Sequence, residues 1–391
     1  RQLKRFLADN VGLDVNIDVP AERDKRVAVI GGGPAGLMAA YRLRKEGFRV
    51  CIYEAASRLG GLLASCIPEY RLPSIVVQRE VSVLEKMGID VKCNTRVGTD
   101  VPLSTLVEDN DAVIITTGAQ VDKKLSICEG EKENVFSGLE FLSKAKTNSQ
   151  LNIGKDVIVI GGGNSAINAA QAAYRLGART VRIVCLESRD EMLAFPEEIE
   201  QALAEGIIIE NGWGPKGYLL DQGNKNKVIG VEFKRCLEVF NQKGQFDPLY
   251  VEGEKQAFTA DTVIVAIGQQ RDLSYLAGTN VQFQHGYVEV DPVTYQTSIA
   301  QIFAAGDVIN GPSSVIDAMA QGREVAESIR RMFSNIPIAY DRGRFNHCVT
   351  EFEVDFSNAD SAPRVHTTRL EGEERRSFKE LEKCLSESEA T

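Results

Sequence analysis

The sequence lacks a long apolar segment, a basic character and any closely spaced pair of cysteines. Because no apolar run approaches the roughly 18 residues needed to cross a bilayer, we expect no membrane span. A formal net charge of -10 argues against nucleic acid as a partner, since a duplex binder needs a basic face to replace counterions. Eight scattered cysteines without a C-x-x-C motif indicate reduced thiols of a cytoplasmic protein and predict no metal site.

The first clear feature that the sequence does contain is a β-α-β unit around a glycine turn. An apolar strand at 27–30 precedes Gly31-Gly-Gly33-Pro-Ala-Gly36, and a helix at 35–46 and a strand at 50–53 follow. In the spacing G-x-G-x-x-G the turn must be tight and the backbone must approach a pyrophosphate, which only glycine tolerates. The helix N-terminus offers free N–H groups, and Glu54 is placed to accept hydrogen bonds from an adenosine ribose. The predicted dinucleotide-binding residues of this unit are Gly31, Gly33, Ala35, Gly36 and Glu54.

The same order of elements recurs from Lys155 onward. A strand at 157–160 leads into Gly161-Gly-Gly163-Asn-Ser-Ala166, followed by a helix at 165–176 and a strand at 181–185. Alanine replaces the third glycine, a variation tolerated where the helix lies slightly farther from the strand. Two such turns are hard to explain by one cofactor, so we predict FAD on the first and a nicotinamide nucleotide on the second. The corresponding residues are Gly161, Gly163, Asn164, Ser165, Ala166 and Glu187.

Two buried-type strands, at 111–118 and 261–268, each end in glycine and close one nucleotide-binding half. A further strand ends in Gly306-Asp307 and precedes Pro312-Ser-Ser-Val315 and a helix. Its carboxylate is placed to bind hydroxyls of a flavin's ribityl and phosphate arm, while the helix N-terminus faces the flavin's pyrimidine carbonyl. An aspartate that merely caps a turn is the alternative. These segments add the predicted cofactor-binding residues Thr117, Gly118, Gly268, Gly306, Asp307, Ser314 and Val315.

These units predict an α/β fold with two Rossmann-type dinucleotide-binding domains, the second inserted in the first. We assign an N-terminal helix and linker to 1–21, the FAD domain to 22–120 and 296–334, and the NAD(P) domain to 121–295. The polar tail at 335–391 is expected to wrap the surface or meet a partner. Since the chain begins with Arg1 rather than Met, one interpretation is that it is a piece of a longer protein.

Together these residues resemble the small (beta) subunit of glutamate synthase and its relatives, over about residues 3–333. The relatives include the FAD subunit of NADH-dependent ferredoxin:NADP oxidoreductases and the N-terminal part of dihydropyrimidine dehydrogenase. The specific marks are Leu3-Lys-Arg-Phe6, Gly60-Gly-Leu-Leu63, Ile67-Pro-Glu-Tyr-Arg-Leu-Pro73, Glu191-Met192 with Ala194, Ala266-Ile-Gly-Gln269 and Ala305-Gly-Asp307. By this resemblance the residues that contact FAD are Glu54, Gly61, Leu62, Arg71 and Asp307, and those that contact the nicotinamide nucleotide are Asn164, Ser165 and Ala166.

The resemblance also implies that electrons leave FAD through iron–sulfur clusters. The cysteine clusters that flank the flavoprotein core in these families are missing from this sequence, so we place them on further chain or on a partner subunit. Cys348 and Cys384 could each join a cluster completed from outside, but an ordinary thiol is the simpler interpretation. Relatives that reduce disulfides carry C-x-x-x-x-C; here only Cys66 is present, so we do not expect disulfide reduction.

One departure from the family concerns the coenzyme. Relatives that use NADPH commonly carry two arginines just past the second strand of the second unit, where this chain has Leu186 and Glu187. A glutamate there would bond a ribose 2′-hydroxyl and repel a 2′-phosphate, which favours NAD(H). Arg189 keeps NADP(H) open, because a mobile guanidinium two residues further on could reach that phosphate.

The leading hypothesis is a flavin-dependent NAD(P)H oxidoreductase module that exchanges electrons with iron–sulfur clusters of a larger complex, of which an electron-bifurcating complex is one form. An NADPH-dependent glutamate synthase small subunit and a non-catalytic flavin-binding scaffold are the alternatives. Hydride transfer needs stacking and distance control more than an acid or base. We therefore predict no catalytic side chain and interpret His285, His347 and His366 as surface or loop residues.

Overall fold

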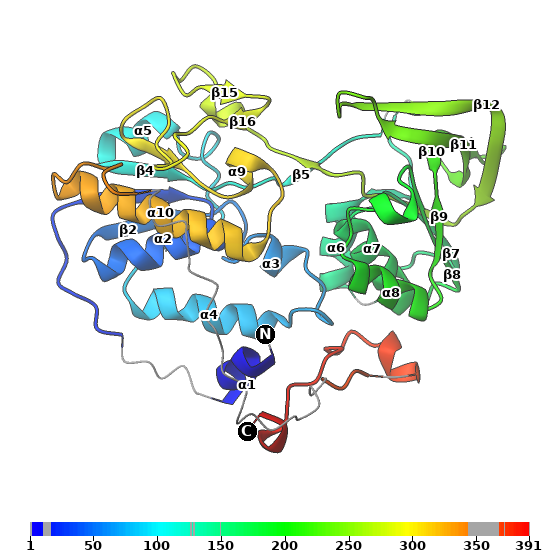
Figure 1. Ribbon diagram of the computed structural model, residues 1–391, viewed down its shortest axis with the longest axis horizontal. Helices are drawn as coiled ribbons and strands as arrows, with labels where there is room; N and C mark the ends of the chain where they lie inside the picture. The colour runs from blue at the N-terminus through cyan, green and yellow to red at the C-terminus, as the bar shows by residue number, and fades with distance from the viewer. Residues whose placement is uncertain are drawn as a thin grey trace, which may run out of the picture.

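The computed structural model describes residues 2–10, 17–125, 127, 130–148, 150–342, 367–370 and 372–390. Two five-stranded sheets, parallel throughout, organise the chain, one on the left and one in green on the right of Figure 1. Helices cover both, which confirms the predicted α/β fold with two Rossmann-type halves. Between 27 and 185 the predicted strands and helices of both β-α-β units agree with the structure to within one residue at each end.

The first sheet combines strands from both ends of the chain. In spatial order it contains β17 (Ile302–Ala304), β4 (Ala112–Ile115), β1 (Arg26–Ile30), β2 (Arg49–Tyr53) and β3 (Asp90–Lys92). One face is covered by α2 (Pro34–Lys45), α4 (Ser74–Lys86) and α10 (Val315–Phe333), and the other by α5 (Leu103–Asp109) and the short helix η2 (Ser274–Leu276). The strand β17 therefore returns to the sheet after the whole second half.

Both faces of the first sheet are buried, which explains the nearly continuous apolar character of its strands. In β1, Val27 and Val29 face the core that contains α2 and α10, whereas Ala28 and Ile30 face the opposite core. Helices α2 and α10 approach closely, because a Cβ added at Gly322 would lie 2.2 Å from the carbonyl oxygen of Ala35. A glycine is required at this crossing.

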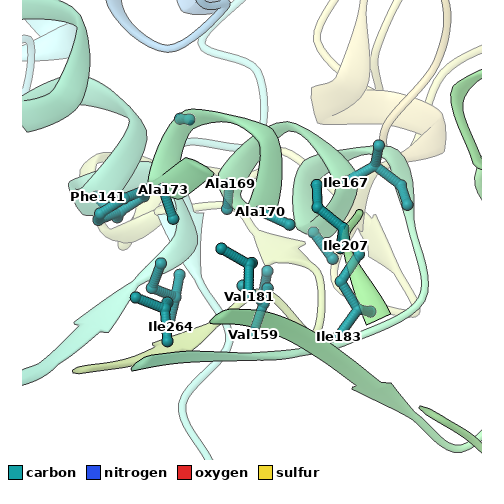
Figure 2. Packing of buried hydrophobic residues seen from close by; sticks show 14 of the residues in the cluster. Phe141, Val159, Ile167, Ala169, Ala170, Ala173, Val181, Ile183, Ile207 and Ile264 are labelled. Atoms are coloured by element: carbon teal, nitrogen blue, oxygen red, sulfur yellow. The ribbon is translucent and has the colours of Figure 1, made fainter. Parts of the chain in front are cut away.

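The second sheet contains, in spatial order, β6 (Val135–Ser137), β13 (Thr262–Val265), β7 (Asp156–Ile160), β8 (Thr180–Cys185) and β9 (Ile208–Asn211). Helices α6 (Gly138–Thr147), α7 (Asn164–Arg175) and α8 (Pro196–Ala204) cover one face, where Figure 2 shows Ala169 and Ala173 of α7 above Val159 and Val181. The other face packs against an antiparallel sheet of β10 (Trp213–Leu220), β11 (Val228–Phe240) and β12 (Phe246–Thr259).

The chain crosses between the halves at two adjacent short strands. β5 (Val121–Asp122) leads into the second half and pairs antiparallel with β14 (Gln269–Gln270), which leads out of it. After β14, the side chains of Leu276, Val281 and Val288 pack in the core of the first sheet. We therefore propose that the second half ends near Gln270 rather than at 295, because apolar residues in this segment complete the first core.

The remaining elements are short or lie at the chain ends. They are α1 (Gln2–Asn10), α3 (Leu62–Ser65), α9 (Asp307–Asn310), α11 (Glu387–Ala390), β15 (Phe283–Gln284), β16 (Tyr287–Val288), η1 (Arg189–Glu191) and η3 (Gly372–Arg376). In the described part of the tail, Leu381 and Leu385 are buried, and the Leu381 amide donates to the carbonyl of Tyr70. This stretch of the tail thus packs on the core of the protein. His347, Cys348 and His366 lie outside the described residues.

Candidate functional site

A cavity of about 770 Å³ lies at the carboxyl ends of β1, β2, β4 and β17 in the first half. This edge of a parallel sheet is where ligands bind in open α/β folds. Twelve of the predicted site residues line it: Gly31, Gly33, Ala35, Glu54, Gly61, Leu62, Thr117, Gly118, Gly306, Asp307, Ser314 and Val315. Residues from five separate stretches of chain are therefore brought together around one space.

The first glycine turn has the geometry that the motif predicts. Gly31 has a φ of +104°, and a Cβ there would lie 2.5 Å from the carbonyl oxygen of Thr116. A Cβ at Gly36 would lie 2.1 Å from the carbonyl oxygen of Gly31, so the helix α2 approaches the turn too closely for any side chain. Because α2 begins at Pro34, its unpaired N–H groups lie at the cavity, as phosphate binding requires.

The carboxylate of Glu54 is held firmly at the end of β2. It is buried, and its two oxygens accept hydrogen bonds from the backbone N–H groups of Gly32 and Ala56, each at 2.7 Å. Each carboxylate oxygen has a further lone pair available. The geometry therefore fits an acceptor for ribose hydroxyls at one end of the cavity.

Asp307 lies on the opposite side of the first turn, immediately after β17. Its Oδ1 accepts hydrogen bonds from the backbone N–H of Ser313 at 3.1 Å and from the Ser313 hydroxyl at 2.9 Å. Burial raises the pKa of Asp307, and these two hydrogen bonds offset only part of the rise. Ser314 caps helix α10, whose first residue, Val315, also lines the cavity. A helix N-terminus and a carboxylate thus meet where the sequence predicts the ribityl and pyrimidine parts of FAD.

Tyr275 is a cavity residue that the sequence analysis did not identify. It comes from η2, and its hydroxyl lies 3.1 Å from that of Thr117, 158 positions away in the chain. Burial raises the pKa of Tyr275, so the hydroxyl remains protonated. A Cβ on Gly98 would lie 2.4 Å from the Cβ of Tyr275, so the backbone at Gly98 packs closely against the base of this side chain. No short-range sequence signal indicates a contact over this separation.

The second glycine turn repeats the geometry of the first but does not line the cavity. Gly161 has a φ of +134°, and a Cβ there would lie 2.2 Å from the carbonyl oxygen of Ala266. Ala166, in the place of the third glycine, is fully buried. The side chain of Asn164 accepts a hydrogen bond from the backbone N–H of Phe195 at 3.0 Å, and Ser165 is half-buried in the first turn of α7.

Glu187 occupies the position in the second half that Glu54 has in the first. A Cβ on Gly162 would lie 2.8 Å from Glu187 Oε2, so the carboxylate lies beside the glycine turn. Glu187 is half-buried, whereas Arg189 is exposed in η1 with its Nη1 4.0 Å from the sulfur of Met192. Gly268, with a φ of +112°, lies at the crossing between the halves, where its carbonyl accepts from the Lys123 amide.

Arg71 and Cys66 are directed away from the cavity. The Arg71 guanidinium forms an ion pair with Glu198 of α8 and donates to Asn168 Oδ1 of α7 at 2.5 Å. The structure thus places Arg71 between the halves, and its assignment to FAD stays a prediction. Cys66 is packed, and burial raises the pKa of its thiol. His285 is exposed, as expected.

Within the described residues, no three His, Cys, Asp or Glu side chains are grouped so that they could hold a metal ion. Over the same residues, no helix combines the length and the apolar character that a bilayer crossing needs.

The chain is similar to several known oxidoreductases. A model of the family "Pyridine nucleotide-disulphide oxidoreductase" matches residues 25–212 and 218–322. The chain is 39% identical over 309 residues to NADP(+)-dependent formate dehydrogenase subunit beta of Moorella thermoacetica. This match covers 78% of the present chain and 43% of the relative. It is 34% identical over 332 residues to the NAD-dependent dihydropyrimidine dehydrogenase subunit PreT of Escherichia coli, covering 84% and 74% of the two chains.

A solved structure with the same fold is FprA from Mycobacterium tuberculosis. It superposes with a TM-score of 0.65 at 18% sequence identity and covers 80% of this chain and 85% of FprA. At this identity the likeness concerns the fold alone. The chain spans less than half the length of the first relative above, so that relative contains extensive sequence with no counterpart in the match.

Proposed function

The chain belongs to the pyridine nucleotide-disulphide oxidoreductase family, and on this basis we propose that it transfers a hydride between NAD(H) and FAD. The proposal rests chiefly on one observation: the chain contains two glycine turns with a following acid, and one of them lines a large cavity together with Asp307. When bound, FAD would take up the two electrons that the nicotinamide loses and release them to a second acceptor.

The residues of the first half fit the flavin. A dinucleotide pyrophosphate would lie against the unpaired N–H groups at the start of α2, where Gly33 carries no side chain to obstruct it. Glu54 would accept hydrogen bonds from the ribose, and Asp307 would hold hydroxyls of the ribityl and phosphate arm. The protein's contribution is therefore binding and orientation, with no side chain required to transfer a proton.

For the second half we propose NAD(H) as the preferred nucleotide, because the carboxylate of Glu187 lies beside the glycine turn. A 2′-phosphate bound there would face this negative charge. The relatives' names include both NAD-dependent and NADP(+)-dependent enzymes, so family membership leaves this choice open. Arg189 is exposed two residues further on and is the side chain that could reverse the preference.

As the electron acceptor we propose an iron–sulfur protein domain or subunit of a larger complex. Two relatives are themselves named as subunits, which supports an assembly of several components. Cys66 is packed in an apolar environment, so we assign it no redox role toward a substrate disulfide. Whether the complex bifurcates electrons is a separate question that the proposal does not require.

The direct test is anaerobic stopped-flow reduction of the flavin-loaded protein by NADH and by NADPH, followed as loss of flavin absorbance. We expect NADH to reduce the flavin at least about tenfold faster at subsaturating concentrations, which corresponds to 1.4 kcal/mol. Faster reduction by NADPH would favour the glutamate synthase alternative. If neither nucleotide reduced the flavin, the proposed activity would be wrong and a non-catalytic scaffold would replace it.

A further inference from the structure

One segment of the first half touches both nucleotide-binding regions. This segment, residues 62–73, consists of α3 and the turn after it, and we refer to it as the bridging loop. Leu62, Leu63, Ser65 and Ile67 line the cavity of the first half. Figure 1 places α3 between the two halves, next to α6. One wall of the cavity is therefore built at the junction of the halves.

The far side of the bridging loop enters the second half. Cys66 is only 6% exposed and belongs to the same apolar core as Phe141 of α6 and Ile167 of α7. Its thiol donates to the carbonyl oxygen of Leu139 at 3.7 Å. The loop is therefore packed into the neighbouring core, so the two halves share an apolar contact.

The side chain of Lys146 in α6 forms hydrogen bonds with the main chain of the bridging loop. Its ammonium donates to the carbonyl oxygen of Leu63 at 3.0 Å and to that of Ile67 at 2.7 Å, and Glu69 Oε1 lies at 3.6 Å. The side chain is 1% exposed, and burial lowers the pKa of Lys146. A buried ammonium is tolerated only where acceptors surround it, so this site is specific for the present position of the loop. Both carbonyls belong to residues that line the cavity.

The other end of the bridging loop contacts the helix of the second glycine turn. The Tyr70 hydroxyl donates to the main-chain oxygen of Asn168 at 3.1 Å, and Arg71 donates to the side-chain oxygen of the same residue. Asn168 lies in α7, which begins at Asn164, directly after the glycine turn. A single loop thus links the flavin cavity to the helix expected to face the nicotinamide nucleotide.

We propose that Lys146 and Arg71 are positioning residues that fix the distance and angle between the two nucleotide sites. This inference rests on the proposed function, because the distance matters only if a hydride passes between the sites. Transfer requires the reacting atoms to be about 3–3.5 Å apart, and a displacement of about 1 Å can cost on the order of 100-fold in rate. Neither residue touches the reacting atoms; both act through the bridging loop.

The test replaces Lys146 by Met, which keeps the length of the side chain and removes its donors. Lys144→Met is the matched control, because Lys144 lies on the same helix but is exposed and pairs with Glu140. We expect faster amide hydrogen exchange across 62–73 in Lys146→Met, and at least about tenfold slower reduction of the flavin by saturating NADH. The Kd of NADH should change less than about twofold, since the second glycine turn is intact. Lys144→Met should match the wild type in all three measurements.

Arg71→Gln is a second variant, for the case that Lys146→Met does not fold. It removes the ion pair with Glu198 at a partly exposed position and should increase exchange at the 70–73 end of the loop. Wild-type exchange and reduction rates in both Lys146→Met and Arg71→Gln would overturn the proposal. If NADH failed to reduce the wild-type flavin, the proposed function would fail, whereas the exchange data would still show whether these two residues hold the loop.

Discussion

The two glycine turns of this chain have the same backbone plan and different surroundings. At the first turn the acid, Glu54, is buried and accepts two backbone N–H groups, and twelve predicted site residues line one cavity. At the second turn the acid, Glu187, is half-buried, and the residues that follow it are exposed. The same motif therefore occurs once in a deep site and once near the surface.

The difference corresponds to what each proposed cofactor has to do. A flavin that stays bound through many turnovers benefits from an enclosed site with many fixed contacts. A nicotinamide nucleotide has to enter and leave in every turnover, which an accessible site allows. The glycine motif by itself indicates that a dinucleotide can bind, whereas the burial of its acid distinguishes the two turns.

The largest expected effect concerns a buried arginine in each half. Arg175 in α7 pairs with Glu205 through two hydrogen bonds of 2.8 and 2.9 Å, while Arg44 in α2 donates only to carbonyls. Glu205→Gln leaves a buried charge unpaired and should lower the free energy of unfolding by about 3–5 kcal/mol. Arg44→Met should cost only about 1–3 kcal/mol. Urea unfolding of both variants checks the order, and an equal loss in both would remove this contrast between the halves.

The second prediction concerns the third position of each glycine motif, which is Gly36 in the first and Ala166 in the second. In Gly36→Ala the new Cβ would overlap the carbonyl oxygen of Gly31, and relieving this overlap costs about 1–3 kcal/mol. We therefore expect the Kd for FAD to rise about 10- to 100-fold, measured by titrating the apoprotein with FAD. Ala166→Gly is the reciprocal variant and should leave the Kd for FAD unchanged. A comparable loss of FAD binding in Ala166→Gly would contradict the assignment of one cofactor to each turn.

The third prediction concerns the acid of the second turn. Glu187→Arg replaces a charge that would repel a 2′-phosphate by one that attracts it, and should shift the ratio of kcat/KM for NADPH over NADH upward by about tenfold or more. Glu197→Arg makes the same change of charge at an exposed position of α8 and serves as the control. An unchanged ratio in Glu187→Arg would show that Glu187 does not select the nucleotide.

The smallest effect is expected in α10, the helix that completes the first cavity. Hydrogen bonds from Arg330, opposed by burial and aided by Arg331, lower the pKa of Glu327 from 4.5 to about 2. A carboxyl with a lowered folded-state pKa stabilises the fold above about pH 4.5, and this contribution is lost as the pH falls toward 2. Because the side chains of the pair remain 30% exposed and solvent screens them, Glu327→Gln should cost under about 1 kcal/mol at pH 7. Thermal unfolding of Glu327→Gln and of the wild type at pH 7 and pH 3 should show that their difference in stability shrinks at low pH. An equal difference at both pH values would show that the ion pair is not its cause.

Local patterns were sufficient to predict the repeated β-α-β units. The apolar strand, the glycine turn and the helix that follows it are each determined by neighbouring residues, so their limits agree with the structure. The same local information identified Glu54 and Asp307, because an acid at the end of a parallel strand lies at the ligand edge of the sheet.

What the sequence did not reveal depends on contacts between distant segments. Tyr275 meets Thr117 only because the chain returns to the first sheet after the second half. Arg71 was predicted from family resemblance as a flavin contact, yet its partners Asn168 and Glu198 belong to the other half. The boundary that we propose near Gln270, in place of the predicted 295, has the same basis, since no local signal separates the chain at β14 from the segment that fills the first core.

The return of the chain to its first sheet also has a consequence during synthesis on the ribosome. The strands of the second sheet lie between Val135 and Val265, so that half can complete its sheet while later residues are still untranslated. The first sheet cannot be completed before β17 is synthesised. Its cavity also requires Asp307 and the start of α10 at Val315. The half whose translation begins earlier is therefore the one that matures last, and FAD can be captured only after nearly the whole of the described fold has left the exit tunnel.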